Sequence, residues 1–290
     1  VTDDGKEPEH VRLQIASDIT FKRESILYDT GACLELDGKG WKPPIRCEAR
    51  CRYYWRVIAD EAFMSETAYW ETGKMEEAWR AQWGGAPFDT KIHPVFRCCF
   101  YLEDLPKSTR IYAAACGIYE IYINGGKAGE EYLSPGYYSY DLWTQYQVWE
   151  AESLLRTGEN EVVVEMGPGW YKGRFGYDGF HENIYGDRML FLAEIIMTYE
   201  DGREQVIGTG PKWEASYGNV TASSIYDGEI FDARIRQKRW WPAEQLSLPV
   251  KGLRARKNPP ISIKERLSPV AVLHTPAGET VLDFGQEGTG

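Results

Sequence analysis

Side chains suited to binding a polyhydroxylated ligand gather in the turns between residues 137 and 188. The aromatic members are Tyr137, Tyr138, Tyr140, Trp143, Trp170, Tyr171, Tyr177 and Tyr185, and the charged members are Arg174, Asp178, Asp187 and Arg188. A sugar site combines a ring face for stacking with a few polar groups that bond the hydroxyls. The residue types therefore allow a carbohydrate site in these loops.

The same residues have a structural interpretation, which we favour. Asp187 and Arg188 could pair with each other or tie their loop to the following strand, and Trp170 could fill the core below the segment Gly167-Pro168-Gly169. Polar groups that become buried are normally hydrogen-bonded in this way. We expect Gly167-Pro168-Gly169 to be a turn and not a phosphate cradle, because Trp170-Tyr171 follows it in place of a helix.

A second polar set lies in the segment IYDGEIFDAR and consists of Asp227, Glu229, Asp232 and Arg234. Three acids within six residues could offer oxygen ligands to a cation such as calcium, although the EF-hand pattern is absent. Alternatively, the carboxylates could bond loop backbone or a neighbouring arginine. We favour the second interpretation and assign no metal site to this segment.

Catalytic signatures are missing from the chain. Glycoside hydrolysis usually needs two carboxylates that flank the bond, but 44 acidic residues make chance proximity common. The sequence contains no GxSxG, HExxH or GxxxxGK[ST] motif. We therefore assign no catalytic residue.

Composition narrows the classes of partner. The net charge of −11, from 33 basic and 44 acidic residues, argues against nucleic acid and against an anionic membrane surface. No apolar run approaches the roughly 20 residues that span a bilayer. The sequence contains 19 Tyr and 11 Trp, most of which we assign to strands and core.

The six cysteines show no metal or disulfide spacing. Cys98 and Cys99 lie in the strand-like run VFRCCFYL, where we expect free thiols that act as small apolar fillers. A disulfide or zinc framework is the less favoured alternative, because no CxxC occurs and the histidines are scattered. Free thiols and the absence of a signal peptide pattern favour a cytoplasmic setting.

Strands separated by turns must position these residues. Asn124-Gly125 lies between two alternating apolar runs and predicts a hairpin, and Asp201-Gly202 predicts another. Seven or more such strands with little helical period are typical of a jelly roll or a similar sandwich. The run YYWRV, with Trp55 as a core aromatic, predicts a fibronectin- or immunoglobulin-like sandwich before it.

These patterns divide the chain into four parts. Residues 1–74 form the first sandwich, which we expect to be truncated or shortened at its start. Residues 75–93 form a linker with a short helical stretch anchored by Trp79 and Trp83. Residues 94–247 form the jelly roll. Residues 248–290 form a connection and the first strand of a further β domain. Because the chain starts without Met and stops within a strand-and-turn pattern, we expect it to be part of a longer protein.

Several segments together resemble a known family. The ordered series of Asn124-Gly125, GWYKGRFG, YGDR and the segment IYDGEIFDAR, together with RYYWRV near the start and DFGQ near the end, resembles the N-terminal β domains of bacterial α-L-rhamnosidases of glycoside hydrolase family 78. The resemblance covers nearly the whole chain and is strongest from Ile111 to Arg234.

The resemblance carries its own expectations. It implies a non-catalytic fragment that packs on an (α/α)6 catalytic barrel of the same polypeptide and shapes its substrate entrance, with Asp227, Glu229, Asp232 and Arg234 at the interdomain border. The complete enzyme would hydrolyse terminal α-L-rhamnosides with inversion. The alternative is an autonomous carbohydrate-binding module that recognises rhamnose or related sugars.

Calcium is the one cofactor that the resemblance raises. Some relatives bind rhamnose through calcium held by an Asp-Asn pair that precedes the strand corresponding to IYEIYING. This chain has Ala115-Cys116-Gly117 there, and none of these side chains offers an oxygen ligand. We therefore expect no cofactor and regard calcium-dependent binding as doubtful.

Overall fold

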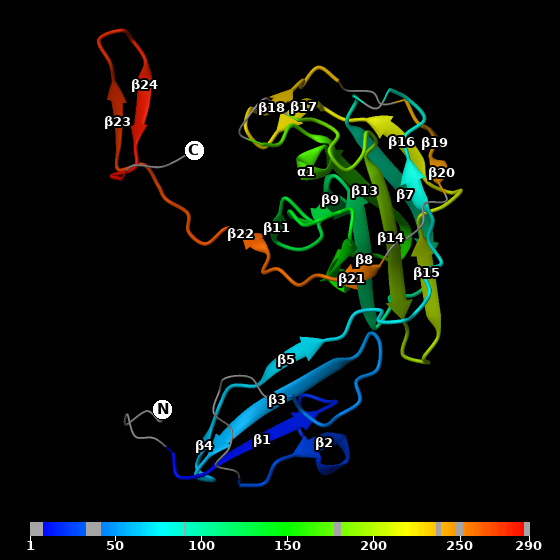
Figure 1. The fold of residues 1–290 in the computed structure, drawn as a ribbon, viewed down its shortest axis with the longest axis vertical. Coiled ribbons are helices and arrows are strands. Elements are labelled where there is room, and N and C mark those ends of the chain that lie inside the picture. The colour runs from blue at the N-terminus through cyan, green and yellow to red at the C-terminus, as the bar shows by residue number, and fades with distance from the viewer. Residues whose placement is uncertain are drawn as a thin grey trace.

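The computed structural model describes residues 8–32, 42–89, 91–176, 181–235, 239–246 and 252–286. The expectation of an all-β protein is confirmed: in this part of the chain, helical residues occur only in α1 (Gly169–Lys172), η1 (Arg23–Ser25) and η2 (Glu152–Leu154). No helix in the described ranges is long and apolar enough to cross a membrane. Figure 1 shows an N-terminal unit, a larger jelly-roll unit and a separate C-terminal hairpin.

The N-terminal unit contains one five-stranded sheet in its described part. Its strands are β1 (Val11–Ala16), β2 (Ile26–Asp29), β3 (Arg52–Ala59), β4 (Phe63–Met64) and β5 (Ala68–Glu71), in the order β2-β1-β3-β4 with β5 also paired to β3. The buried ring of β3 is Tyr53, which stacks on Trp70 at 5.3 Å between ring centroids. Trp55, expected in the core, is only half-buried; the residue opposite it on β5 is the small Ala68, whereas Tyr53 has Trp70 opposite.

Two sheets build the jelly-roll unit. The six-stranded sheet has the order β10-β9-β13-β7-β16-β19, and the seven-stranded sheet has the order β20-β6-β14-β8-β12-β21 with β15 paired to β14. The first comprises β10 (Gly126–Lys127), β9 (Ile118–Ile123), β13 (Gly158–Gly167), β7 (Pro94–Leu102), β16 (Glu214–Tyr217) and β19 (Trp241–Pro242). The second comprises β20 (Glu244–Leu246), β6 (Trp83–Gly85), β14 (Leu190–Thr198), β8 (Ser108–Cys116), β12 (Thr144–Glu150), β21 (Leu253–Ala255) and β15 (Glu204–Gly208).

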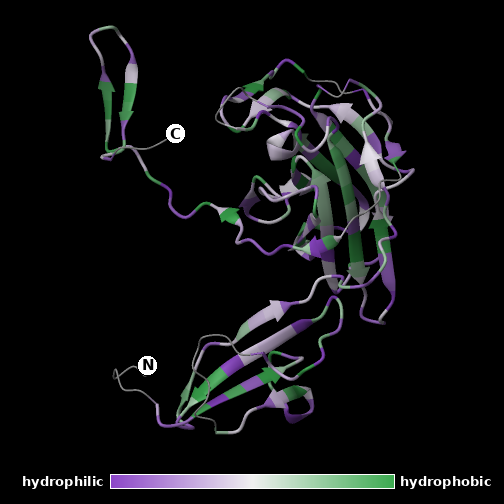
Figure 2. Cartoon of the chain, viewed as in Figure 1, coloured by the Kyte–Doolittle hydropathy of each residue, from purple (hydrophilic) through white to green (hydrophobic). Residues whose placement is uncertain are grey.

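The main core lies between these two sheets, where Figure 2 shows the apolar central strands. Phe96 and Phe191 stack across it with ring centroids 6.5 Å apart, and Trp213 lies 6.0 Å from Phe191. Cys98 is buried in this cluster as the small apolar filler that the sequence predicts. The same prediction is wrong for Cys99, which is exposed because successive side chains of β7 point to opposite faces of the sheet. A second apolar cluster covers the opposite face of the seven-stranded sheet and includes Trp79 and Trp83, so both tryptophans anchor the linker as expected.

The hairpin predictions are correct and two local predictions are wrong. Asn124 and Gly125 have φ of 52° and 84° and connect β9 to β10, and Gly202 turns β14 into β15. The described residues of the linker form no helix. Trp83–Gly85 become strand β6 instead, because the small glycines let the chain pair with β14 and β20. The segment after Gly167-Pro168 forms the single helical turn α1 instead of a plain turn.

Three two-stranded elements complete the description. They are β11 (Glu131–Tyr132) with β22 (Ile261–Ser262), β17 (Val220–Ser224) with β18 (Gly228–Phe231), and β23 (Ala271–His274) with β24 (Thr280–Asp283). The last hairpin projects away from the jelly roll (Figure 1) and exposes apolar side chains such as Val272 and Leu282.

Candidate functional site

The loop aromatics pack mainly against one another. Tyr138 stacks on Tyr140 at 3.9 Å, and Tyr140 contacts Tyr171 and Tyr185 at 5.2 and 5.1 Å between ring centroids. Tyr138 is buried, and burial raises the pKa of its phenol. The structure thus brings these four predicted residues together as a packed cluster.

Two further candidate rings border this cluster. Tyr137 lies 5.2 Å from Phe175 and 6.4 Å from Trp170, yet remains 46% exposed. Trp143 is half-buried, and the Nζ atom of Lys257 lies 4.9 Å from its ring centroid. Among the candidate rings in the described part of the chain, Tyr137 is therefore the most exposed.

The charged loop candidates do not converge on one point. Arg188 forms an ion pair with Glu244 and donates a hydrogen bond to the carbonyl of Ala86 at 3.0 Å, so it ties its loop to the strand region around β6 and β20. Asp187 is exposed. Tyr177 and Asp178 lie outside the described residues.

Hairpin β17–β18 carries the second predicted set and is connected to the aromatic loop. Arg174 donates to Oδ1 of Asp227 at 2.7 Å, and its guanidinium lies 5.1 Å above the ring of Tyr226. Arg234 donates both Nε and Nη2 to Asp232 at 2.8 Å, and this bonding lowers the pKa of Asp232 to about 2. Carboxylates held by arginines in this way match the non-metal alternative of the sequence analysis.

A pocket of about 470 Å³ opens between this hairpin and the outer face of the six-stranded sheet. Its apolar wall includes Ile118, Met166, Val220 and Phe231, and Glu165 and Glu229 are among its polar residues. We call it the hairpin pocket. Of the second predicted set, Glu229 is the residue that lines it.

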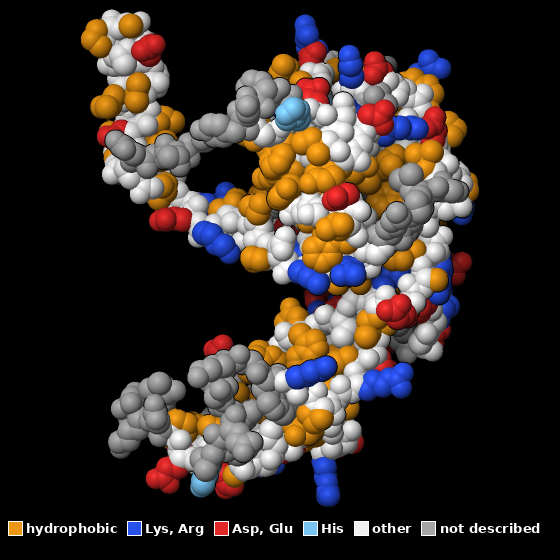
Figure 3. Space-filling model, in the orientation of Figure 1, with side chains coloured by type: hydrophobic (Ala, Val, Ile, Leu, Met, Phe, Trp, Pro, Cys, Tyr) orange, Lys and Arg blue, Asp and Glu red, His pale blue; other side chains and the backbone are white. Residues whose placement is uncertain are grey.

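Exposed apolar side chains surround the hairpin pocket. Ile230 and Phe231 of β18 are 64% and 60% exposed, and Tyr132 and Leu133 expose part of their surface across the pocket. Figure 3 shows hydrophobic side chains gathered on the face of the jelly-roll unit around β9, β11 and α1. Contiguous exposed apolar surface of this kind marks an interaction site.

His93 is a pocket residue that the sequence analysis did not select. Its side chain is 7% exposed, its Nδ1 atom has no hydrogen-bond partner, and burial together with the charge of Lys172 lowers its pKa. The burial of His93 could not be predicted from the sequence, because a single histidine before a strand belongs to no recognisable motif.

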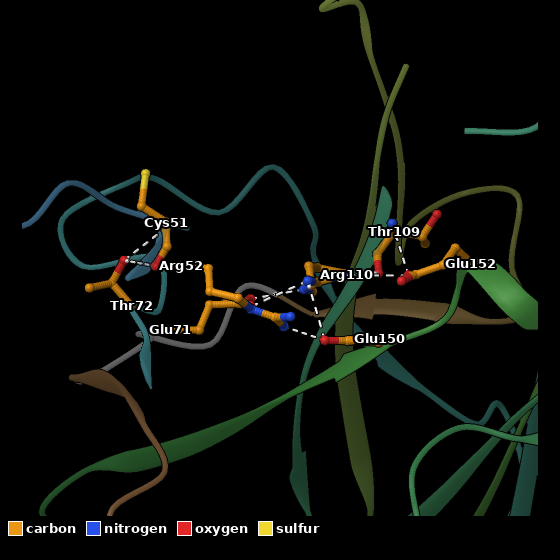
Figure 4. Close-up of polar contacts among 8 residues, drawn as sticks. All are labelled: Cys51, Arg52, Glu71, Thr72, Thr109, Arg110, Glu150 and Glu152. Atoms are coloured by element: carbon orange, nitrogen blue, oxygen red, sulfur yellow. Dashed lines mark hydrogen bonds and ion pairs between the residues drawn. The ribbon is translucent and has the colours of Figure 1, made fainter. Parts of the chain in front are cut away.

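The second feature missed is a charged network between the N-terminal unit and the jelly roll. Arg52 and Arg110 share the carboxylate of Glu71, with Arg110 Nε 2.9 Å from Oε1, and Glu150 bonds to Arg52 from β12 (Figure 4). One residue in the sequence could have indicated this boundary between the two units. Glu194 is a lone charge in the apolar run MLFLAEIIMTY, and it pairs with Lys74 at the same boundary.

The segment Ala115-Cys116-Gly117, where calcium ligands were considered, has a well-defined local geometry. Ala115 and Cys116 end β8 as buried residues and Gly117 follows with φ of 128°. Within the described ranges, no group of three His, Cys, Asp or Glu side chains is arranged to hold a metal ion.

Two packed β-sheets, preceded by a smaller β unit and carrying a pocket beside hairpin β17–β18, define the larger unit of this chain as a jelly-roll domain. A model of the α-L-rhamnosidase N-terminal domain matches residues 104–265, and the chain belongs to that family.

Individual relatives agree with this assignment. An α-L-rhamnosidase of Streptomyces avermitilis is 32% identical over 234 residues, which cover 76% of this chain and 22% of the relative. An α-L-rhamnosidase of Formosa agariphila is 25% identical over 283 residues, covering 82% of this chain and 30% of the relative. The crystal structure of native α-L-rhamnosidase from Aspergillus terreus superposes with a TM-score of 0.78 and 27% identity, over 97% of this chain and 34% of that one. The chain thus spans less than a third of these two curated relatives.

Proposed function

We propose that this chain is the non-catalytic N-terminal part of an α-L-rhamnosidase. The observation that carries the proposal is the family match over residues 104–265, in relatives more than three times longer than their matched segment. The all-β fold adds support, because the described residues contain no helices from which a helical barrel could be built. The complete enzyme would cleave terminal α-L-rhamnosides with inversion, using a general acid and a base-activated water supplied elsewhere in the polypeptide.

The partner of this chain would be the catalytic (α/α)6 barrel of the same polypeptide. We assign its docking surface to the hairpin pocket and its rim, namely Tyr132, Leu133, Ile230 and Phe231. Their exposed apolar area favours burial by roughly 25 cal/mol for each Å² removed from water. Asp227 and Glu229 would border the interface, with Asp227 held by Arg174.

Charge-introducing variants in the complete polypeptide test this docking surface. Ile230→Asp and Phe231→Asp should lower the hydrolysis rate of 4-nitrophenyl α-L-rhamnopyranoside, because an unpaired buried carboxylate opposes packing of the two bodies. Leu105→Asp, at a 55% exposed site on the β7–β8 connection, is the matched control and should leave the rate unchanged. Equal hydrolysis rates for all three variants would contradict the proposal that the hairpin is part of the interface.

Carbohydrate binding by the chain itself is a second candidate function. The ring of Tyr137 supports it, because it remains 46% exposed and an accessible aromatic ring is what a sugar stacks on. Titration of L-rhamnose into the chain, followed by tryptophan fluorescence and heat with and without calcium, tests it. Saturable binding that Tyr137→Ala abolishes would establish this function, and no signal at millimolar sugar would exclude it.

A further inference from the structure

A buried ion pair joins the end of the N-terminal unit to the centre of the jelly roll. The Nζ atom of Lys74 lies 2.5 Å from Oε2 of Glu194, and the two side chains are 4% and 1% exposed. Lys74 follows β5 by three residues, whereas Glu194 lies in the middle of β14. Nζ of Lys74 also lies 5.0 Å from the ring centroid of Trp79, so the ammonium group makes a cation–π contact in addition to the ion pair.

The remaining polar groups of this pair are also bonded across the boundary. The second carboxylate oxygen of Glu194 accepts hydrogen bonds from the backbone N–H groups of Arg80 and Ala81 in the linker. The backbone N–H of Lys74 donates to Oη of Tyr146 at 2.7 Å. Gly73 fits against the same phenol so closely that a Cβ atom there would overlap it.

A second, more exposed set of contacts lies beside the buried pair. Arg110 from β8 and Arg52 from β3 both bond to Glu71 of β5, and Glu150 from β12 closes the set (Figure 4). Arg50 adds a further crossing contact, because its Nε atom lies 2.7 Å from Glu77 and its Nη1 atom lies 2.7 Å from Glu204 of β15. Five strands from two units are therefore connected by charged groups.

We propose that residues Gly73–Ala81 form a fixed joint in which the buried Lys74–Glu194 pair sets the angle between the N-terminal unit and the jelly roll. The N-terminal unit is then a rigid arm and not a module on a flexible tether. This proposal is independent of the proposed enzymatic function, because it rests only on contacts within the chain.

The two sets of contacts differ in their response to salt. Exposed ion pairs are screened above roughly 0.1 M salt, whereas a pair removed from solvent is screened much less. Removing one partner of a buried pair leaves an uncompensated charge, which is strongly destabilising. The joint should therefore hold at high ionic strength as long as Lys74 and Glu194 are both present.

Small-angle scattering of the unaltered chain gives the first test. The scattering profile should be the same at 0.05 M and 0.5 M NaCl if the buried pair sets the angle. A radius of gyration that rises with salt would show that the exposed contacts hold the units together, and would overturn the proposal.

Trypsin digestion of variants gives the second test, because cleavage follows Lys74 and Arg80 within the joint. Glu194→Gln should accelerate cleavage after Arg80 by at least roughly tenfold, since a lost buried ion pair shifts local opening by more than 1.4 kcal/mol. The double variant Lys74→Met/Glu194→Gln should recover much of the resistance, because it removes the stranded charge. Glu200→Gln is the control, because the Glu200 side chain, which pairs with Lys107, is 79% exposed. Cleavage of Glu194→Gln at the rate of this control would overturn the proposal.

Discussion

The guanidinium of Arg174 lies 2.7 Å from Oδ1 of Asp227 and thereby joins the aromatic loop to hairpin β17–β18. These residues are 53 positions apart, and they belong to two sets that the sequence presents separately. The contact therefore fixes the turn of the hairpin, which borders the proposed docking surface, against the aromatic loop.

Removal of this contact should loosen the hairpin without unfolding the domain. Arg174→Ala is expected to cost about 1 kcal/mol or less, because the Asp227 side chain is 64% exposed and such ion pairs are weak. Chymotrypsin should nevertheless cleave faster beside Tyr226, which loses the guanidinium above its ring. Arg234→Ala breaks only a contact with a residue two positions away, so it should leave this cleavage rate unaltered.

His93 should make the stability of the domain depend on pH. Burial, reinforced by the charge of Lys172, lowers the pKa of His93, so the unfolded chain binds the proton more tightly than the folded one. This contribution is complete above the ordinary histidine pKa of about 6.5 and is lost as the pH falls through the lower folded-state pKa. Urea denaturation between pH 7.5 and pH 5 should show a decline in the free energy of unfolding.

The substitution His93→Gln isolates this contribution from that of the carboxylates. Asp232, whose pKa is also lowered, contributes in the same direction at more acidic pH and is unchanged in the variant. The pH dependence between 7.5 and 5 should therefore be smaller in His93→Gln than in the unaltered chain. Identical slopes would mean that His93 titrates normally in the folded state.

Two glycines with similar backbone conformations should respond differently to alanine. Gly129 has φ of 74° and a Cβ atom there would overlap the ring of Trp149, whereas Gly136 has φ of 84° and open space around it. Gly136→Ala should cost only the left-handed strain of roughly 1 kcal/mol. Gly129→Ala should cost roughly 2 kcal/mol more, because the buried ring must shift. Equal thermal midpoints for the two variants would contradict the packing around Trp149.

The phenol of Tyr119 should matter more than that of Tyr122. Tyr119 is buried and donates to the carbonyl of Ala113 at 2.9 Å and lies 2.5 Å from Oε1 of Gln147. Tyr119→Phe should cost roughly 1–3 kcal/mol in urea denaturation, since it strands a buried acceptor. Tyr122→Phe removes a half-buried contact with Glu120 and should cost less than about 1 kcal/mol. The reverse order would place the Tyr119 hydroxyl outside the core network.

Local patterns made much of the fold predictable. Asn124-Gly125 allows positive φ at both turn positions, so its hairpin follows from residue type alone. Cys98 lies on the inward-facing side of β7 between half-buried Arg97 and exposed Cys99, so the strand-like run VFRCCFYL predicts one buried thiol. Both features depend on residues close together in the chain.

Long-range pairing escaped the sequence analysis for a physical reason. Glu194 meets Lys74 across 120 positions, and Arg188 meets Glu244 across 56. No period or motif encodes such distances, and Arg188 could be assigned to a sugar site on residue type alone. Strand β6 was missed in the same way, because Trp83–Gly85 becomes a strand only when β14 offers an edge.

Hydrolysis of 4-nitrophenyl α-L-rhamnopyranoside tests the central proposal most directly. We expect no turnover by the purified 290-residue chain and inverting hydrolysis by the complete polypeptide that contains it. Turnover by the chain alone would contradict a non-catalytic role. A complete polypeptide that leaves the rhamnoside intact would contradict the assignment to an α-L-rhamnosidase.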